Sequence, residues 1–181
     1  MKRKILLAAS FALLTISAGP LAAHDPAVEE KLRGAKACAG CNLAGANFSG
    51  QDLSGANLAG ANLSGANLTE AKLIGVNLTG ANLTGAELLK ANFSKANLNG
   101  ADVAGANLSY ANFSGSDLRD ADLSGVDSVH VNYEGANMVK ADLAGADLSF
   151  AKFKGADITD AILDGVDMEG ADFEGTKGFL P

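Results

Sequence analysis

Large apolar residues recur at every fifth position along most of the chain. From Leu43 to Phe173, all but one of 27 positions in steps of five hold such a residue, and the exception is Ser128. A small residue, usually Ala, stands two places before nearly all of them. A period of five matches neither the 3.6-residue period of a helix nor the two-residue period of a strand. The chain is therefore expected to turn every five residues.

Four such turns close a square coil of 20 residues, with the large and the small residue inside and the other three positions facing water. Coils stacked at strand spacing, about 4.8 Å, make a rod of about 32 Å. Residues 20 apart should then form columns. Gly45 to Gly165 in steps of 20 predict a corner column, because glycine adopts turn angles at the least cost. Five aromatic residues predict an internal column: Phe93, Phe113, Tyr133, Phe153 and Phe173.

The repeated motif resembles the pentapeptide-repeat family. It reads Ala-Asn-Leu-Ser-Gly at 61–65, Ala-Asn-Leu-Thr-Gly at 81–85 and Ala-Asp-Leu-Ala-Gly at 141–145, and the resemblance extends over residues 41–175. The resemblance implies an all-β fold, a right-handed quadrilateral β-helix. The spacing alone does not determine the hand.

The start of the chain is typical of an exported protein. Residues 1–23 combine a basic beginning (Lys2 to Lys4) with an apolar stretch, and we interpret them as a signal peptide cleaved near Ala23. The mature protein is then expected in the periplasm or outside the cell, and not as an integral membrane protein.

Both ends of a stacked rod need covering. Residues 24–40 are expected to form an N-terminal cap, in which Asp25 and Pro26 begin a short capping helix that continues to about Ala37. Residues 176–181 form a C-terminal tail whose Phe179 and Leu180 can fold over the last layer. If they leave it open, the C-terminal coil is a surface for a homodimer.

Charge is distributed unevenly. The formal charge of −7 becomes −10 when the three basic residues of the signal peptide are removed. Residues 42–100 hold three acids and three bases, whereas residues 101–174 hold fifteen acids and four bases. This acidity argues against nucleic acid or anionic lipid as a ligand. It leaves three interpretations open: solubility alone, attraction of a basic partner, and loosely held cations.

Cys38 and Cys41 are the only cysteines, at the junction of cap and first coil. In an exported protein we expect them to form a disulfide that holds the cap. A redox-active dithiol is the alternative, since this spacing can lower a thiol pKa. Asn42 stands where a haem-attachment motif needs His, and two cysteines are too few for a structural zinc site.

Nothing in the sequence assembles a catalytic group. His24 and His130 are the only histidines, and the many aspartates stand where the repeat requires a polar turn residue. No insertion interrupts the array to form a pocket. We expect no enzyme, no cofactor and no metal ion.

One corner column departs from glycine and is the candidate site. At intervals of 20 it contains Tyr110, His130 and Phe150, with Leu89 and Val129 beside it, on a surface otherwise rich in Ser, Thr, Asn and Asp. Exposed apolar patches often mark contact sites. Two interpretations remain open, sequence drift in a tolerant solenoid and a surface for a partner.

The leading functional hypothesis is a non-enzymatic exported scaffold that binds an unknown protein or an envelope component. Some members of the family that the motif resembles mimic duplex DNA and bind DNA topoisomerases, which is the second hypothesis. A thiol-redox protein based on Cys38 and Cys41 is the third. The partner, the oligomeric state and the biological role stay open.

Overall fold

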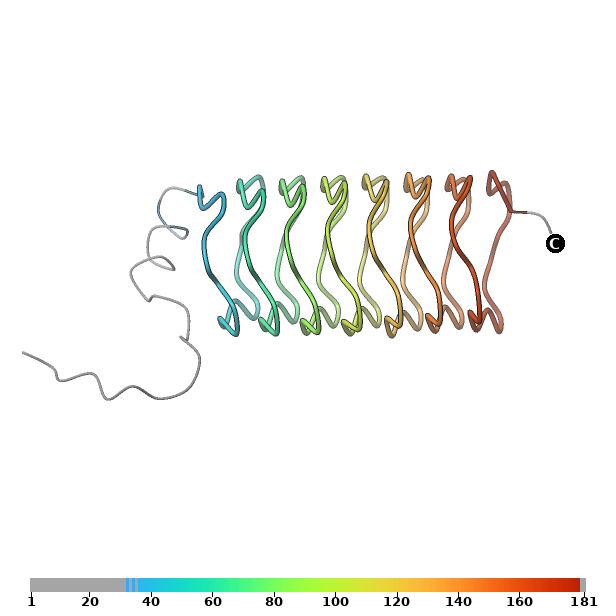
Figure 1. The fold of residues 1–181 in the computed structure, drawn as a ribbon, viewed down its shortest axis with the longest axis horizontal. Helices are drawn as coiled ribbons and strands as arrows, with labels where there is room; N and C mark the ends of the chain where they lie inside the picture. The colour runs from blue at the N-terminus through green and yellow to red at the C-terminus, as the bar shows by residue number, and fades with distance from the viewer. Residues whose placement is uncertain (1–31, 33, 35, 180–181) are drawn as a thin grey trace, which may run out of the picture.

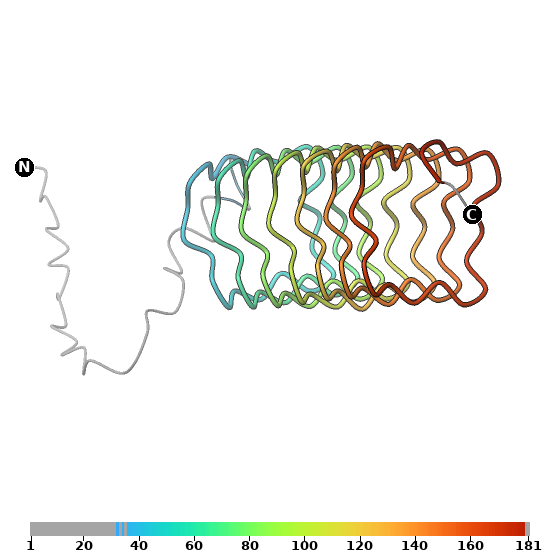
Figure 2. The same ribbon diagram turned by 45° about the vertical axis from the view of Figure 1, so that its right-hand side comes forward.

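The chain winds into a rod of stacked square coils (Figures 1 and 2). The computed structural model describes Leu32, Gly34 and residues 36–179. Its repeats form a right-handed quadrilateral β-helix, in which parallel bridges join each repeat to the one 20 residues later, from Ala37 with Asn57 to Asp157 with Lys177. Each repeat contributes one bridge residue and a two-residue turn, without a longer strand in the described residues. The predicted 20-residue coil is confirmed.

The backbone is paired along the length of the rod. Leu43 donates its N–H to the carbonyl of Asn62 (2.7 Å), and Asn62 donates to Cys41 (2.8 Å), so the pairing alternates between neighbouring coils. At each corner a turn closes on itself, as when Ala46 donates to Leu43 at 3.0 Å. Such pairing satisfies backbone groups that face only the next coil, and it fixes the columns.

The core is a continuous shaft of apolar side chains. The large and small inward residues are almost completely buried from Leu43 to Ile158. The predicted internal aromatic column is confirmed: Phe93 and Phe113 stack at 4.7 Å, and Phe153 and Phe173 at 4.8 Å between ring centroids. The predicted corner glycines are also confirmed, because Gly45 to Gly165 in steps of 20 all adopt positive φ, between 61° and 69°.

The β-helix begins one repeat earlier than the predicted boundary at residue 41. Ala37 already forms a bridge, and Cys38 occupies an interior position with 2% of its surface exposed. Cys38 is smaller than the large apolar residue that the repeat motif has at this interior position. The motif therefore does not identify residues 36–40 as a repeat. Leu32 and Gly34 are helical and Leu32 is buried, and the helix ends before Lys36, slightly earlier than the expected end at about Ala37. The predicted signal peptide and the start of the predicted cap lie outside the described residues.

The rod also extends past residue 175. Lys177 still pairs with Asp157, so the predicted tail begins later than residue 176. As expected, Phe179 covers part of the last layer: its ring stacks on Phe173 at 4.0 Å. Leu180 lies outside the described residues. No helix in the described part of the chain has the length and hydrophobicity needed to cross a membrane.

Candidate functional site

Three aromatic side chains form an exposed stack on one corner of the rod, which we call the corner ladder: Tyr110, His130 and Phe150. The centroids of Tyr110 and His130 lie 5.0 Å apart, and those of His130 and Phe150 also 5.0 Å. Tyr110 keeps 55% of its surface exposed and Phe150 47%. The 20-residue coil thus brings together three rings that are far apart in sequence, and leaves them open to solvent.

Both faces of His130 and Phe150 are covered, so these two rings present their edges. His130 lies between the other two rings, and the far side of Phe150 covers Gly170, where an added Cβ would lie 2.6 Å from the ring. On the other side the same column continues as Lys90 and Glu70, whose Nζ and Oε1 atoms are 3.8 Å apart. A ligand therefore meets edges, the Tyr hydroxyl and the imidazole.

The ladder occupies a backbone conformation that favours glycine. The φ angles are 61° at Tyr110, 60° at His130 and 58° at Phe150. Left-handed geometry costs an L-residue about 1–2 kcal/mol relative to glycine. Three bulky residues here are thus unfavourable for the turn itself, and stacking offsets a part of this cost.

Leu89 and Val129, the other two predicted stripe residues, lie in the column one residue before the ladder. Tyr110 donates its N–H to the carbonyl of Val129 at 2.9 Å, which places the two columns side by side. Both Leu89 and Val129 are half-buried, and Ser109, which stands between them in the column, is nearly buried. They widen the apolar surface of the ladder without forming a continuous strip.

Carboxylates follow the same face in what we call the acidic column: Asp127, Asp147 and Asp167. Parallel bridges join Asp127 to Asp147 and Asp147 to Asp167. The hydroxyl of Ser109 donates to Asp127 at 2.8 Å, so this carboxylate contacts the residue that precedes Tyr110. The hydroxyl and the backbone N–H of Ser149 lower the pKa of Asp147 below its usual value.

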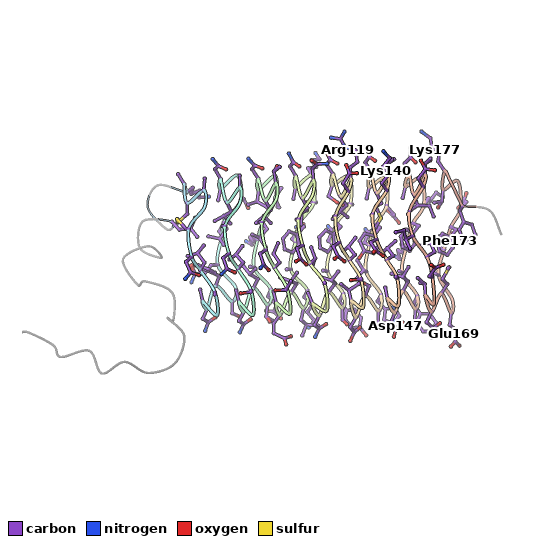
Figure 3. The ribbon with its side chains drawn as sticks, in the orientation of Figure 1. Arg119, Lys140, Asp147, Glu169, Phe173 and Lys177 are labelled. Atoms are coloured by element: carbon purple, nitrogen blue, oxygen red, sulfur yellow. A yellow bond between two sulfur atoms is a disulfide. The ribbon has the colours of Figure 1, made fainter. Side chains whose placement is uncertain are left out.

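Charged side chains project from both edges of the rod. In Figure 3, Asp147 and Glu169 project from one edge, and Arg119, Lys140 and Lys177 from the other. Arg119 is paired locally, since its guanidinium donates to both carboxylate oxygens of Asp117, at 2.8 and 2.6 Å. That interaction holds the pKa of Asp117 below its usual range. The ladder thus borders the edge with the acidic column.

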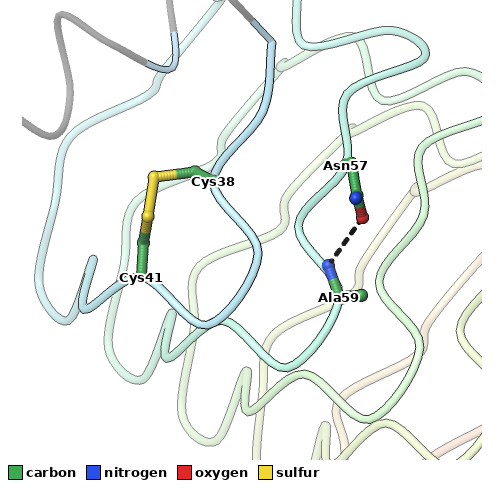
Figure 4. Close-up of a disulfide and its surroundings, with 4 residues drawn as sticks. All are labelled: Cys38, Cys41, Asn57 and Ala59. Atoms are coloured by element: carbon green, nitrogen blue, oxygen red, sulfur yellow. Dashed lines mark hydrogen bonds between the residues drawn. A yellow bond between two sulfur atoms is a disulfide. The ribbon is translucent and has the colours of Figure 1, made fainter.

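Cys38 and Cys41 lie at the first turn of the rod and are bonded in the structure, with an S–S distance of 2.06 Å (Figure 4). Cys38 points into the core, and Cys41 donates its N–H to the carbonyl of Cys38 at 3.2 Å. The disulfide spans the turn beside Asn57 and Ala59 of the next coil, where the Ala59 N–H donates to the Asn57 side chain at 3.3 Å.

The irregular Ser128 has a partner that the sequence does not reveal. Its hydroxyl lies 3.1 Å from the Tyr133 hydroxyl, and both side chains are completely buried. Burial raises the pKa of Tyr133 and keeps its phenol neutral, while the Ser128 bond acts in the opposite direction. The two hydroxyls satisfy each other within an apolar shaft.

No pocket opens on the structure, and no group of three His, Cys, Asp or Glu side chains is placed to hold a metal ion within residues 36–179. His130 belongs to the ladder, and His24 lies outside the described residues. Ile74 and Ile162 are exposed apolar residues that the sequence analysis missed, but they stand singly, which is ordinary on a protein surface.

Comparison with known proteins agrees with this geometry. The family model of pentapeptide repeats (8 copies) matches residues 37–69, 61–100, 86–125 and 136–175. HetL, a pentapeptide repeat protein involved in heterocyst differentiation regulation in the cyanobacterium Nostoc, is 30% identical, with 78% of this chain and 84% of HetL covered and a TM-score of 0.46.

Two further solved structures are similar. A pentapeptide repeat protein from the Arabidopsis thaliana thylakoid lumen is 31% identical, with 63% of this chain and 66% of that chain covered and a TM-score of 0.43. QnrB1, a plasmid-mediated fluoroquinolone resistance protein, is 25% identical, with 75% and 88% covered and a TM-score of 0.30. No curated protein matches.

Proposed function

Because the chain belongs to the pentapeptide-repeat family, we propose that it is a non-enzymatic exported scaffold that binds another protein or an envelope component through the corner ladder. The exposed stack of Tyr110, His130 and Phe150 is the observation that carries this proposal. Large aromatic side chains that stay open to solvent at an unfavourable φ are better explained by a contact than by the fold.

The proposed location follows from the sequence of residues 1–23, which lie outside the described residues. A bonded Cys38–Cys41 pair is compatible with an oxidising compartment. Export itself can be tested by N-terminal sequencing of the mature chain from a cell fraction. A chain that still begins at Met1 in the cytosol would contradict it.

The binding role is tested by crosslinking in the native envelope. A photoreactive residue replaces Tyr110, and a matched chain carries it at Ser64, on a face without aromatic corner residues. We expect a specific adduct at Tyr110 alone, identified by mass spectrometry. Equal labelling at both positions, or none, would reject the ladder as the contact surface.

We also propose that two copies associate through the C-terminal coil. Leu163, Met168 and Phe173 are partly exposed there, whereas their counterparts one coil earlier are buried: Leu143, Leu148 and Phe153. Light scattering of the wild type and of Leu163→Glu tests this, with a dimer expected for the first and a monomer for the second. A monomeric wild type would contradict the proposal.

A second candidate, mimicry of duplex DNA, is favoured by stacked carboxylates on two neighbouring faces, among them Asp102, Asp122 and Asp142. It predicts that this protein inhibits a purified topoisomerase in a DNA supercoiling assay.

For the third candidate, a thiol-redox role, thiol titration of the exported form is decisive. A stable, unreactive disulfide would exclude it.

A further inference from the structure

We propose that the corner ladder and the acidic column together form a docking surface for a basic amphipathic α-helix of a partner protein, lying along the axis of the rod. The inference rests on the proposed binding function and deepens it by naming the kind of ligand. Its support comes from the spacing, the ring orientation, the charge and the backbone geometry of this corner.

The spacing of the ladder matches a helix better than a strand. Successive ring centroids are 5.0 Å apart along the rod. An α-helix presents side chains on one face once per turn, about every 5.4 Å. An extended strand presents them at every second residue, about every 6.6–6.8 Å. Three apolar side chains at i, i+3 or i+4, and i+7 can thus lie in register with Tyr110, His130 and Phe150.

The ring orientation selects aliphatic side chains. Because neighbouring rings and Gly170 cover both faces of His130 and Phe150, a sugar or a nucleobase that needs a free face for stacking does not fit well on these two rings. Leucine or methionine side chains can pack between ring edges. Leu89 and Val129 provide further apolar contact on one side of the ladder.

The charge selects a basic flank. The acidic column runs parallel to the ladder on the same face, with Asp127, Asp147 and Asp167 in the coils of His130, Phe150 and Gly170, whereas the coil of Tyr110 has Asn107 at this position. Hydrogen bonds from Ser109 to Asp127 and from Ser149 to Asp147 hold two of these carboxylates in place. A helix whose apolar stripe covers the ladder would direct one polar flank toward these carboxylates. Lys or Arg residues on that flank would complement them.

The backbone geometry allows binding to be separated from folding. Glycine is favoured at the φ angles of all three ladder positions, so a Tyr110→Gly, His130→Gly, Phe150→Gly variant keeps the turn conformation. A matched control exists at another corner of the rod. Asp120, Lys140 and Asp160 also have positive φ, between 55° and 60°, and can be replaced by glycine in the same way.

The experiment measures fluorescence anisotropy of labelled synthetic peptides with the full chain. The probe is an 18-residue Leu/Lys peptide with an amphipathic helical pattern. One control peptide has the same composition with Leu and Lys alternating, and a second replaces Lys by Glu. A third protein variant changes Asp127, Asp147 and Asp167 to Asn.

We expect the wild type to bind the helical Leu/Lys peptide, and the ladder variant to bind it about tenfold more weakly or worse. The control-corner variant should stay within about twofold of the wild type, because it leaves the docking surface intact. The Asn variant should lose affinity and most of its salt dependence. The proposal would be overturned if the helical Leu/Lys peptide bound the ladder variant as tightly as the wild type, or if the wild type bound either control peptide as tightly as the helical Leu/Lys peptide.

Circular dichroism establishes that each variant is folded. If the glycine variant does not fold, a variant with asparagine at the same three positions is used instead, because asparagine tolerates the left-handed conformation. The crosslinking experiment separates the two proposals. A specific envelope adduct at Tyr110 without peptide binding would refute only the helix, whereas absence of the adduct would refute the binding role of the ladder.

Discussion

The pair of Ser128 and Tyr133 shows how single residues deviate from the repeat. The sequence analysis identifies Ser128 as an interior irregularity, but it does not reveal the partner. Tyr133 occupies an inward position five residues later, on the next face, and only the side-chain geometry brings the two hydroxyls to 3.1 Å. The period predicts which residues point inward, whereas side-chain contacts across a corner depend on torsion angles that the period does not encode.

We predict that Ser128→Ala destabilises the protein by about 1–3 kcal/mol, because it leaves the buried Tyr133 hydroxyl without a partner. The double variant Ser128→Ala, Tyr133→Phe should lose less than the sum of the two single changes. Urea unfolding of all four proteins measures this. Strict additivity would show that the two hydroxyls do not interact.

Within a column, side chains of the same type recur in successive coils, where they either form hydrogen bonds with one another or repel one another. In the N-terminal half the Asn columns are bonded internally: Asn62 donates to Asn42 at 3.3 Å, and Asn77 to Asn57 at 3.2 Å. In the C-terminal half the column of Asn42 and Asn62 contains consecutive aspartates, Asp102, Asp122 and Asp142, which have no donor for each other. The sequence predicts the columns and their charge, because both follow from position alone.

We predict that Asp122→Asn stabilises the rod by about 0.5 kcal/mol, since it removes repulsion from Asp102 and Asp142. Asn keeps the oxygen that accepts the Ser124 N–H at 2.9 Å. Melting temperatures at low and high salt measure the effect, which should shrink as salt rises. As a control, Asn62→Asp should not stabilise the protein. A destabilised Asp122→Asn chain would contradict the prediction.

Turn carboxylates make stability depend on pH. The Thr159 hydroxyl and N–H donate to Asp157 at 2.6 and 3.1 Å, and these bonds lower the pKa of Asp157. Because the pKa of Asp157 is lower in the folded protein than in the unfolded chain, where it is about 3.9, the ionised carboxylate stabilises the fold at pH values above about 3.9. This stabilisation is lost as the pH falls through the pKa of the folded protein.

Thr159→Ala removes the hydroxyl bond, which lowers the pKa of Asp157 more than the N–H bond does. We therefore predict that the gap in melting temperature between wild type and Thr159→Ala narrows as pH falls from about 5 to 2. Thermal melts across that range measure it. A gap that stays constant, or widens in acid, would assign the effect of Thr159 to packing.

At the scale of the whole molecule, the two ends of the rod differ. Leu32 and the disulfide cover the first coil, whereas the last coil leaves several inward side chains partly exposed. The sequence predicts a helical cap, and it leaves open whether Phe179 and Leu180 cover the last coil. It misses where the rod starts, because Cys38 replaces the expected large residue at the first interior position.

We predict that the variant Cys38→Ala, Cys41→Ala loosens the first coil only. In a stacked repeat each coil contacts only its neighbours, so a loss at one end should stay local. Hydrogen exchange should therefore accelerate for residues near 36–45 and remain unchanged near the corner ladder. Faster exchange along the whole rod would instead indicate that unfolding is global and begins at the disulfide.

The 20-residue coil also sets a rule for how this protein can change length. Inserting or deleting 20 residues between the cap and Tyr110 adds or removes one complete turn, so the cap and the corner ladder keep their relative orientation. A change of five residues fits the core equally well, but it rotates the cap by a quarter turn relative to the ladder. A 20-residue change thus alters the length of the rod without changing the direction of the ladder relative to the cap, whereas a five-residue change alters that direction. A partner that contacts both the cap and the ladder would tolerate a 20-residue change but not a five-residue change.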